Sequence, residues 1–126
     1  MANYTFHHVH HEASDVDKAV EFYQRNFDGV LQERNGKGGV QRAKMIVGGA
    51  MINITDRADT RVGLSRYQGL DHFAFRTDDF EATMARLREN GVNIWQEPES
   101  PVPGVRVVFI SGPDDVKIEV LQIDAV

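Results

Sequence analysis

The sequence predicts an α+β fold made of two βαβββ modules, and three observations lead to this prediction. The order of apolar strand patterns and amphipathic helix patterns in the first half of the chain returns in the second half. Each predicted helix begins near a capping signal and stops at a glycine. Three pairs of positions share one offset of 64 residues: His8 and His72, Ser14 and Asp78, Asp15 and Asp79. A fixed internal period predicts two copies of one structural unit.

The first module is expected at about 4–57. A strand around Phe6–Val9 leads to a helix whose apolar face begins at Val16, with Ser14 and Asp17 as a capping box and Gly29 as the stop. Three glycine-bounded strands follow, at Val30–Glu33, Val40–Val47 and Met51–Thr55. This order gives one βαβββ unit.

The second module is expected at about 70–124, after a polar linker at about 58–69. Asp78 and Glu81 form its capping box, Phe80, Met84 and Leu87 form its helix face, and Gly91 is its stop. Strands are predicted at Asn93–Gln96, Val105–Ser111 and Lys117–Ile123, with a proline-rich loop at Pro98–Gly104. The two modules together make a single domain over residues 1–126.

The composition limits the classes of function. A chain of 126 residues with 41% hydrophobic and 26% charged residues is an ordinary globular protein. Its net charge of −5 argues against nucleic acid or an anionic membrane surface as a partner. The absence of cysteine excludes disulfides, thiolate metal ligands and a cysteine nucleophile. No apolar run approaches the ~18 residues of a membrane helix, so we expect a soluble, cytoplasmic protein.

Glu119 is the first candidate for a functional residue, because it interrupts the apolar strand that also carries Ile118 and Val120. A carboxylate in such surroundings needs a cation, a metal or several donors. An ordinary ion pair with Arg106 or Arg42 is one possibility. His8 and His72 offer the other, because two imidazoles and one carboxylate outline a metal site. His72 alone could equally be a hydrogen-bonded core residue. The metal ligand could also be a neighbour of His8, since His7, His10 and His11 lie close by in the sequence.

Further candidates lie on the strand of His8 and at the position that corresponds to Glu119. Alternation puts His8, His10 and Glu12 on one face of the first strand. His10 and Glu12 are therefore candidates for a general acid or base, although a surface histidine and an arginine-paired glutamate would explain them as well. Asn53 occupies the position in the first module that matches Glu119 in the second.

These motifs together resemble the vicinal oxygen chelate (VOC) superfamily of glyoxalases, epimerases, extradiol dioxygenases and fosfomycin and bleomycin resistance proteins. The resemblance covers roughly residues 5–123 and rests on His8 with Asp15 seven residues later, His72 with Asp79 seven residues later, and the segment Gly112–Glu119. It implies that the strands of both modules curl into an open, barrel-like cleft that holds one divalent metal ion. The implied metal ligands are His8, Asn53, His72 and Glu119.

The resemblance implies three kinds of activity. Iron, manganese, nickel, cobalt and zinc all suit such ligands, and an ion that chelates two adjacent oxygens of a small substrate would stabilise an enolate. With His10 or Glu12 as the base, this is lyase or isomerase chemistry. Asn53 departs from the carboxylate of the family's glyoxalases, which weakens the case for lactoylglutathione as substrate.

The other two hypotheses are an Fe(II) extradiol dioxygenase and a resistance-type or metal-free protein that binds a small ligand. The dioxygenase needs the same ligands as the lyase. The metal-free protein would instead use an aromatic cleft, with Trp95, Phe73, Phe75 and Phe109 as lining. In all three cases we expect a homodimer, because small modules leave sheet edges and one side of the cleft to cover.

Overall fold

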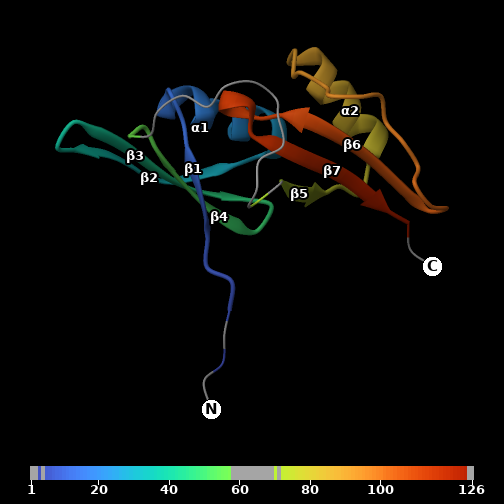
Figure 1. Ribbon diagram of the computed structural model, residues 1–126, viewed down its shortest axis with the longest axis horizontal. Helices are drawn as coiled ribbons and strands as arrows, with labels where there is room; N and C mark the ends of the chain where they lie inside the picture. Colours follow the sequence, from blue (N-terminus) through green and yellow to red (C-terminus); the bar gives the residue numbers. More distant parts are fainter. Residues whose placement is uncertain (1–2, 4, 58–69, 71, 125–126) are drawn as a thin grey trace. The chain divides into compact units, whose positions relative to one another are not determined.

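The computed structural model of the chain describes residues 3, 5–57, 70 and 72–124. The chain forms two compact units, Met1–Thr60 and Arg61–Val126, which we call the first and second units. Each unit has one helix and one small sheet (Figure 1). The predicted α+β class with two related modules is therefore confirmed, and the two sheets are separate and not closed. The predicted linker at 58–69 lies outside the described residues.

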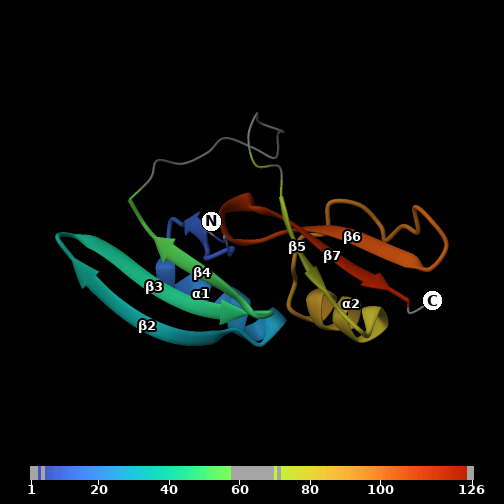
Figure 2. The same ribbon diagram turned by 90° about the horizontal axis from the view of Figure 1, so that it is seen from below.

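The first unit has the predicted βαβββ order. Its elements are β1 (Val9–Glu12), α1 (Val16–Phe27), β2 (Val30–Lys37), β3 (Val40–Val47) and β4 (Ala50–Thr55). The strands lie in the order β1-β4-β3-β2, with β1 parallel to β4 and the other pairs antiparallel. Figure 2 shows β4 and β3 beside the helix α1.

The core of the first unit lies between α1 and one face of this sheet. The helix buries one apolar stripe of side chains, and alternate residues of β3 and β4 meet it. The buried members are Val16, Ala19, Val20, Tyr23, Ala43, Met45, Val47, Ile52 and Ile54. The intervening residues of β1 and β4 lie on the opposite face of the sheet. They include His10, Glu12, Asn53 and Thr55.

Two boundaries in the first unit differ from the prediction. Strand β1 begins at Val9, so His8 precedes the strand. Strand β2 runs to Lys37 and not only to Glu33, because Gly38 and Gly39 both adopt positive φ values, 62° and 82°. Two consecutive residues with positive φ make a tight hairpin turn that continues the strand pairing up to its ends.

The second unit has the same beginning and a shorter sheet. Its elements are β5 (Phe73–Arg76), α2 (Phe80–Glu89), β6 (Val105–Ser111), a 3₁₀ turn at Pro113–Asp115 and β7 (Lys117–Ile123). The strand order is β5-β7-β6, with β5 parallel to β7. Helix α2 buries Phe80, Met84 and Leu87, as the sequence predicted.

The predicted strand at Asn93–Gln96 is wrong. Only an isolated bridge between Ile94 and Ile110 joins this segment to β6. Pro98 follows closely and has no N–H to donate, so a regular ladder does not continue. The segment still runs beside β6, since the Trp95 N–H donates to the Phe109 carbonyl at 2.9 Å.

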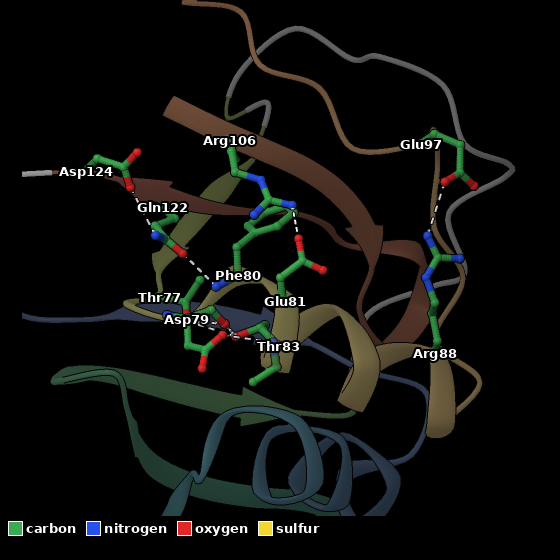
Figure 3. A network of polar contacts seen from close by, with 11 residues as sticks. Thr77, Asp79, Phe80, Glu81, Thr83, Arg88, Glu97, Arg106, Gln122 and Asp124 are labelled. Carbon is green, nitrogen blue, oxygen red and sulfur yellow. Dashed lines mark hydrogen bonds and ion pairs between the residues drawn. The ribbon is translucent and has the colours of Figure 1, made fainter. Parts of the chain in front are cut away.

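Both predicted helix caps are displaced by one residue. Asp15 and Asp79, not Ser14 and Asp78, are the N-caps, and their carboxylates accept from the N–H groups of Lys18 and Ala82, both at 3.0 Å. The start of α2 carries further polar contacts (Figure 3), where the Phe80 N–H donates to Oε1 of Gln122 at 2.6 Å. None of the helices within the described ranges is long and apolar enough to cross a membrane.

The cap assignment predicts a difference between two adjacent aspartates. Asp79→Ala is expected to lower the free energy of unfolding by about 0.5–2 kcal/mol, because the N–H of Ala82 loses its acceptor. Asp78→Ala, a change of the exposed neighbour, is expected to stay within about 0.5 kcal/mol of the wild type. Urea unfolding followed by circular dichroism measures both values, and equal losses would contradict the assignment.

Candidate functional site

His10, Glu12 and Thr55 form a hydrogen-bonded cluster on the sheet face of the first unit that points away from α1. His10 Nε2 lies 2.7 Å from Thr55 Oγ1 and 2.9 Å from Glu12 Oε1. The Thr55 hydroxyl donates to the same Glu12 oxygen at 2.6 Å. The side chains of His10 and Glu12 are 35% and 32% exposed. An imidazole oriented by a carboxylate in a partly exposed position is an arrangement suited to proton transfer.

Glu12 is held at both carboxylate oxygens. Its Oε2 accepts from the backbone N–H of Arg57 at 3.1 Å, and the Arg57 guanidinium lies 3.6 Å from Oε1. These contacts fix the position of both carboxylate oxygens. This environment suits Glu12 to orienting and stabilising a charged His10, and it makes His10 the better of the two predicted candidates for the base.

Asn53 lies beside His10 on the same sheet face. The two residues are register partners in the parallel pair of β1 and β4. The side-chain oxygen Oδ1 of Asn53 is buried, and no hydrogen-bond partner for it occurs among the described residues. A buried amide oxygen without a donor is costly, so this atom is suited to accept a metal ion or a donor group of a ligand.

His8 lies in the segment before β1, and its side chain is exposed. Its Nδ1 is 2.8 Å from Nδ1 of His7, and the two rings meet edge to face at 5.0 Å. The described contacts of His8 are thus with its neighbour. His11, on the other face of β1, is a core residue whose Nδ1 lies 2.9 Å from the Tyr23 hydroxyl.

His72 and Glu119 meet in the second unit. Nε2 of His72 lies 3.4 Å from Oε1 of Glu119, and the two side chains are 29% and 21% exposed. The imidazole also meets the ring of Phe109 edge to face at 5.2 Å. The alternative partner Arg106 instead pairs with Glu81 on α2 and covers the Phe80 ring. An imidazole and a carboxylate therefore converge as they would at a metal ion.

The strand registers of the two units match at the candidate positions. Asn53 pairs with His10, and Glu119 pairs with Ala74, which is 64 residues after His10. Asn53 and Glu119 therefore occupy corresponding positions, as the sequence indicated. Ala74 has no proton to exchange, so the first unit alone carries a base candidate at this position.

The candidate ligands form two incomplete sets. In the described part of the chain, no three His, Cys, Asp or Glu side chains converge as a metal-binding group. The second unit offers one imidazole and one carboxylate, and the first offers the orphaned oxygen of Asn53 together with His8. The donor types suit a divalent ion of the iron-to-zinc series, so the residues present fit the predicted cofactor.

The aromatic lining predicted for a metal-free cleft is divided between two faces. Phe109 is the register partner of Glu119 and shares its face, whereas Phe73 pairs with buried Ile118 and meets the Phe75 ring edge to face, with the centroids 5.6 Å apart. The four rings cannot line one surface, which weakens the metal-free hypothesis. Sequence reasoning also missed Thr55, whose only signal was its position two residues after Asn53.

Comparison with known proteins begins with a family match. Residues 5–120 match the family described as the Glyoxalase/Bleomycin resistance protein/Dioxygenase superfamily. Among curated proteins, the sequence is 28% identical over 127 residues to the lactoylglutathione lyase GLX1 of Arabidopsis thaliana, with 95% of this chain but only 44% of that protein covered. It is 27% identical over 133 residues to a probable lactoylglutathione lyase of Vibrio cholerae, covering 97% and 93%.

Solved structures share the fold at lower sequence identity. A glyoxylase/bleomycin resistance protein/dioxygenase domain from Frankia sp. EAN1pec superposes with a TM-score of 0.80 at 18% identity, over 97% of this chain and 93% of that one. The fosfomycin resistance protein FosX of Listeria monocytogenes gives a TM-score of 0.79 at 17% identity, over 96% and 94%. A variant of FosX has been solved with Mn(II) and 1S,2S-dihydroxypropylphosphonic acid.

Proposed function

Because the chain belongs to the Glyoxalase/Bleomycin resistance protein/Dioxygenase superfamily, we propose that it is a divalent-metal-dependent lyase or isomerase with His10 as its general base. The observation that carries this proposal is the cluster of His10, Glu12 and Thr55, in which one imidazole nitrogen is fixed at 2.7 Å and 2.9 Å from two oxygens. The cluster supports proton transfer because the carboxylate of Glu12 can orient the imidazole and stabilise its charged form.

The proposed metal ligands are His72, Glu119, Asn53 and His8. The first two already lie within 3.4 Å of one another, and the third has a buried oxygen with no donor among the described residues. When bound, the ion supplies Lewis-acid stabilisation of negative charge on adjacent substrate oxygens. A FosX structure with Mn(II) supports manganese as the first ion to test.

His10 would remove a proton beside the substrate carbonyl, and Glu12 would stabilise the imidazolium that results. The Thr55 hydroxyl donates to Glu12, so it holds the carboxylate in place while the imidazole changes charge. Arg57 fixes the second oxygen of Glu12 through its backbone N–H. The same imidazole can then return the proton to a neighbouring atom, which gives an isomerase, or to a leaving group, which gives a lyase.

Deuterium exchange tests this role of His10. Protein loaded with Mn(II) is expected to catalyse uptake of deuterium beside the carbonyl in a panel of 2-oxo acids and thioesters, measured by NMR in D₂O. His10→Gln is expected to lower the exchange rate about 10²- to 10⁴-fold, and Glu12→Gln is expected to lower it less. Glu97→Gln, at an exposed site, serves as the control.

Unchanged exchange in His10→Gln would contradict the proposal. Oxygen consumption with a catechol by Fe(II)-loaded protein, without any exchange activity, would favour the dioxygenase instead. We also propose that the protein is cytoplasmic and forms a homodimer. The order of strands supports the dimer, since it leaves β1 and β2 as edges of one sheet and β5 as an edge of the other.

A further inference from the structure

An arginine lies on the same sheet face as the cluster of His10, Glu12 and Thr55. Arg42 in β3 is the register partner of Thr55 in β4, and the two strands lie side by side (Figure 2). Paired residues of antiparallel strands direct their side chains to the same side of the sheet. Ala43, the next residue of β3, is buried in the core beside α1. Arg42 therefore points away from the helix, as the cluster does.

The polar side chains beside Arg42 in β2 and β3 bind one another. Asn35, its register partner in β2, donates to Oε1 of Glu33 at 3.1 Å. Lys44, two residues after Arg42 on the same face, lies 3.7 Å from Oε2 of the same carboxylate. Glu33 is therefore engaged at both oxygens by groups other than Arg42.

Glu12, another carboxylate of this face, is engaged as well. Its oxygens contact His10, the Thr55 hydroxyl, and the backbone and side chain of Arg57. Within the described ranges, the guanidinium of Arg42 donates to no oxygen and pairs with no carboxylate, and only its backbone carbonyl accepts a side-chain hydrogen bond. Arg42 thus presents an exposed cation beside the cluster.

A second arginine of the same strand pair shows the difference. Arg34 in β2 donates from Nε to Asp17 and from a terminal nitrogen to Oε1 of Gln41, both at 2.9 Å. These contacts tie Arg34 to α1 and to β3, which is a structural role. Arg42 makes none of them, so its N–H donors are available to a ligand.

The charges on the face of the cluster also favour an anionic ligand. The ion pairs of Lys44 with Glu33 and of Arg57 with Glu12 cancel. The charge of Arg42 beside them is not compensated, although the whole chain carries a net charge of −5. A local positive charge at a site attracts anions to that position.

We infer that Arg42 binds a carboxylate of the substrate, and that this carboxylate lies at the end of the molecule away from the carbon that loses its proton. The inference rests on the proposed function, in which His10 removes that proton. Strand β4 separates β1 from β3, so the backbones of His10 and Arg42 are about 10 Å apart at the usual strand spacing. A guanidinium can hold a carboxylate through two parallel hydrogen bonds. The substrate class is therefore a 2-oxo acid with a second, distal carboxylate.

Two probes with the same number of carbon atoms test this inference. 2-Oxoadipate and 2-oxohexanoate share the 2-oxo acid group, and only the first has a terminal carboxylate. In isothermal titration, Mn(II)-loaded wild type is expected to bind 2-oxoadipate about tenfold or more tightly than 2-oxohexanoate. Arg42→Gln is expected to lose this preference, because it removes the charge and keeps a polar side chain. Arg25→Gln removes the same charge from the exposed side of α1 and is expected to keep the preference.

The two proposals fail in different ways. Equal affinities for the two probes in the wild type, or a preference that survives in Arg42→Gln, would overturn the role of Arg42, while deuterium exchange into either probe leaves the proposed function standing. A wild type that retains no Mn(II) and exchanges no deuterium would overturn the proposed function itself. Arg42→Met provides a second neutral variant if the glutamine variant does not fold, and circular dichroism checks both.

Discussion

Glu119→Gln is expected to weaken Mn(II) binding at least about hundredfold. The carboxylate supplies the only negative charge of the four proposed ligands, and its Oε1 lies 3.4 Å from Nε2 of His72. Glutamine keeps the shape of the side chain and removes its charge, so the loss would come from the ligand and not from the packing of β7. Isothermal titration of the apo-protein with Mn(II) measures the change.

Glu97→Gln is the matched control, because Glu97 is an exposed glutamate of the second unit that forms an ion pair with Arg88. It is expected to bind Mn(II) as the wild type does. His72→Gln should behave like Glu119→Gln if the two side chains act on one ion. Wild-type affinity in Glu119→Gln would show that the carboxylate is only an ion-pair partner of the histidine.

Tyr23→Ala is expected to lower the free energy of unfolding by about 3–5 kcal/mol. Tyr23 is completely buried between α1 and the first sheet, and its removal leaves a cavity that the surrounding side chains cannot fill. The hydroxyl also lies 2.9 Å from Nδ1 of buried His11. Burial raises the pKa of the Tyr23 phenol, so its hydroxyl keeps its proton over the ordinary pH range. Urea unfolding measures the loss.

Tyr23→Phe separates the hydrogen bond from the volume. This variant keeps the ring and is expected to lower the free energy of unfolding by about 1–3 kcal/mol, because Nδ1 of His11 loses this partner inside the core. Phe22→Leu, at the neighbouring half-buried position, provides a comparison outside the contact with His11. A loss in Tyr23→Phe as large as that in Tyr23→Ala would contradict the packing account.

The repeat in the sequence predicted most of the fold. Its offset of 64 residues predicted the start of both helices, and the matching patterns of the last strand in each module predicted the correspondence of Asn53 with Glu119. The strand registers agree with this correspondence, because two copies of one unit pair their strands in the same way. The displaced caps show where local signals fall short. Ser14 and Asp15 are both good N-cap residues, and only the backbone path decides which carboxylate or hydroxyl reaches the N–H of Lys18.

The site was predictable in part. Alternation along β1 put His10 and Glu12 on one face, and their 2.9 Å contact agrees with it. The positions of Thr55 and Trp95 were not predictable, since Thr55 meets His10 and Glu12, and Trp95 meets Ser111, through contacts between segments distant in sequence. Threonine is common in strands for reasons of packing alone, and the predicted strand at 93–96 gave no indication that Trp95 would cover Lys117.

The most direct test of the central claim is the effect of Mn(II) on the NMR spectrum of ¹⁵N-labelled protein. A bound paramagnetic ion broadens the amide signals nearest to it. Small amounts of Mn(II) are expected to broaden the signals of Asn53, His72 and Glu119 before all others, which would establish these residues as metal ligands. Early broadening confined to the two aspartates of the 3₁₀ turn, Asp114 and Asp115, with the signals of Asn53 and Glu119 unchanged, would contradict the claim.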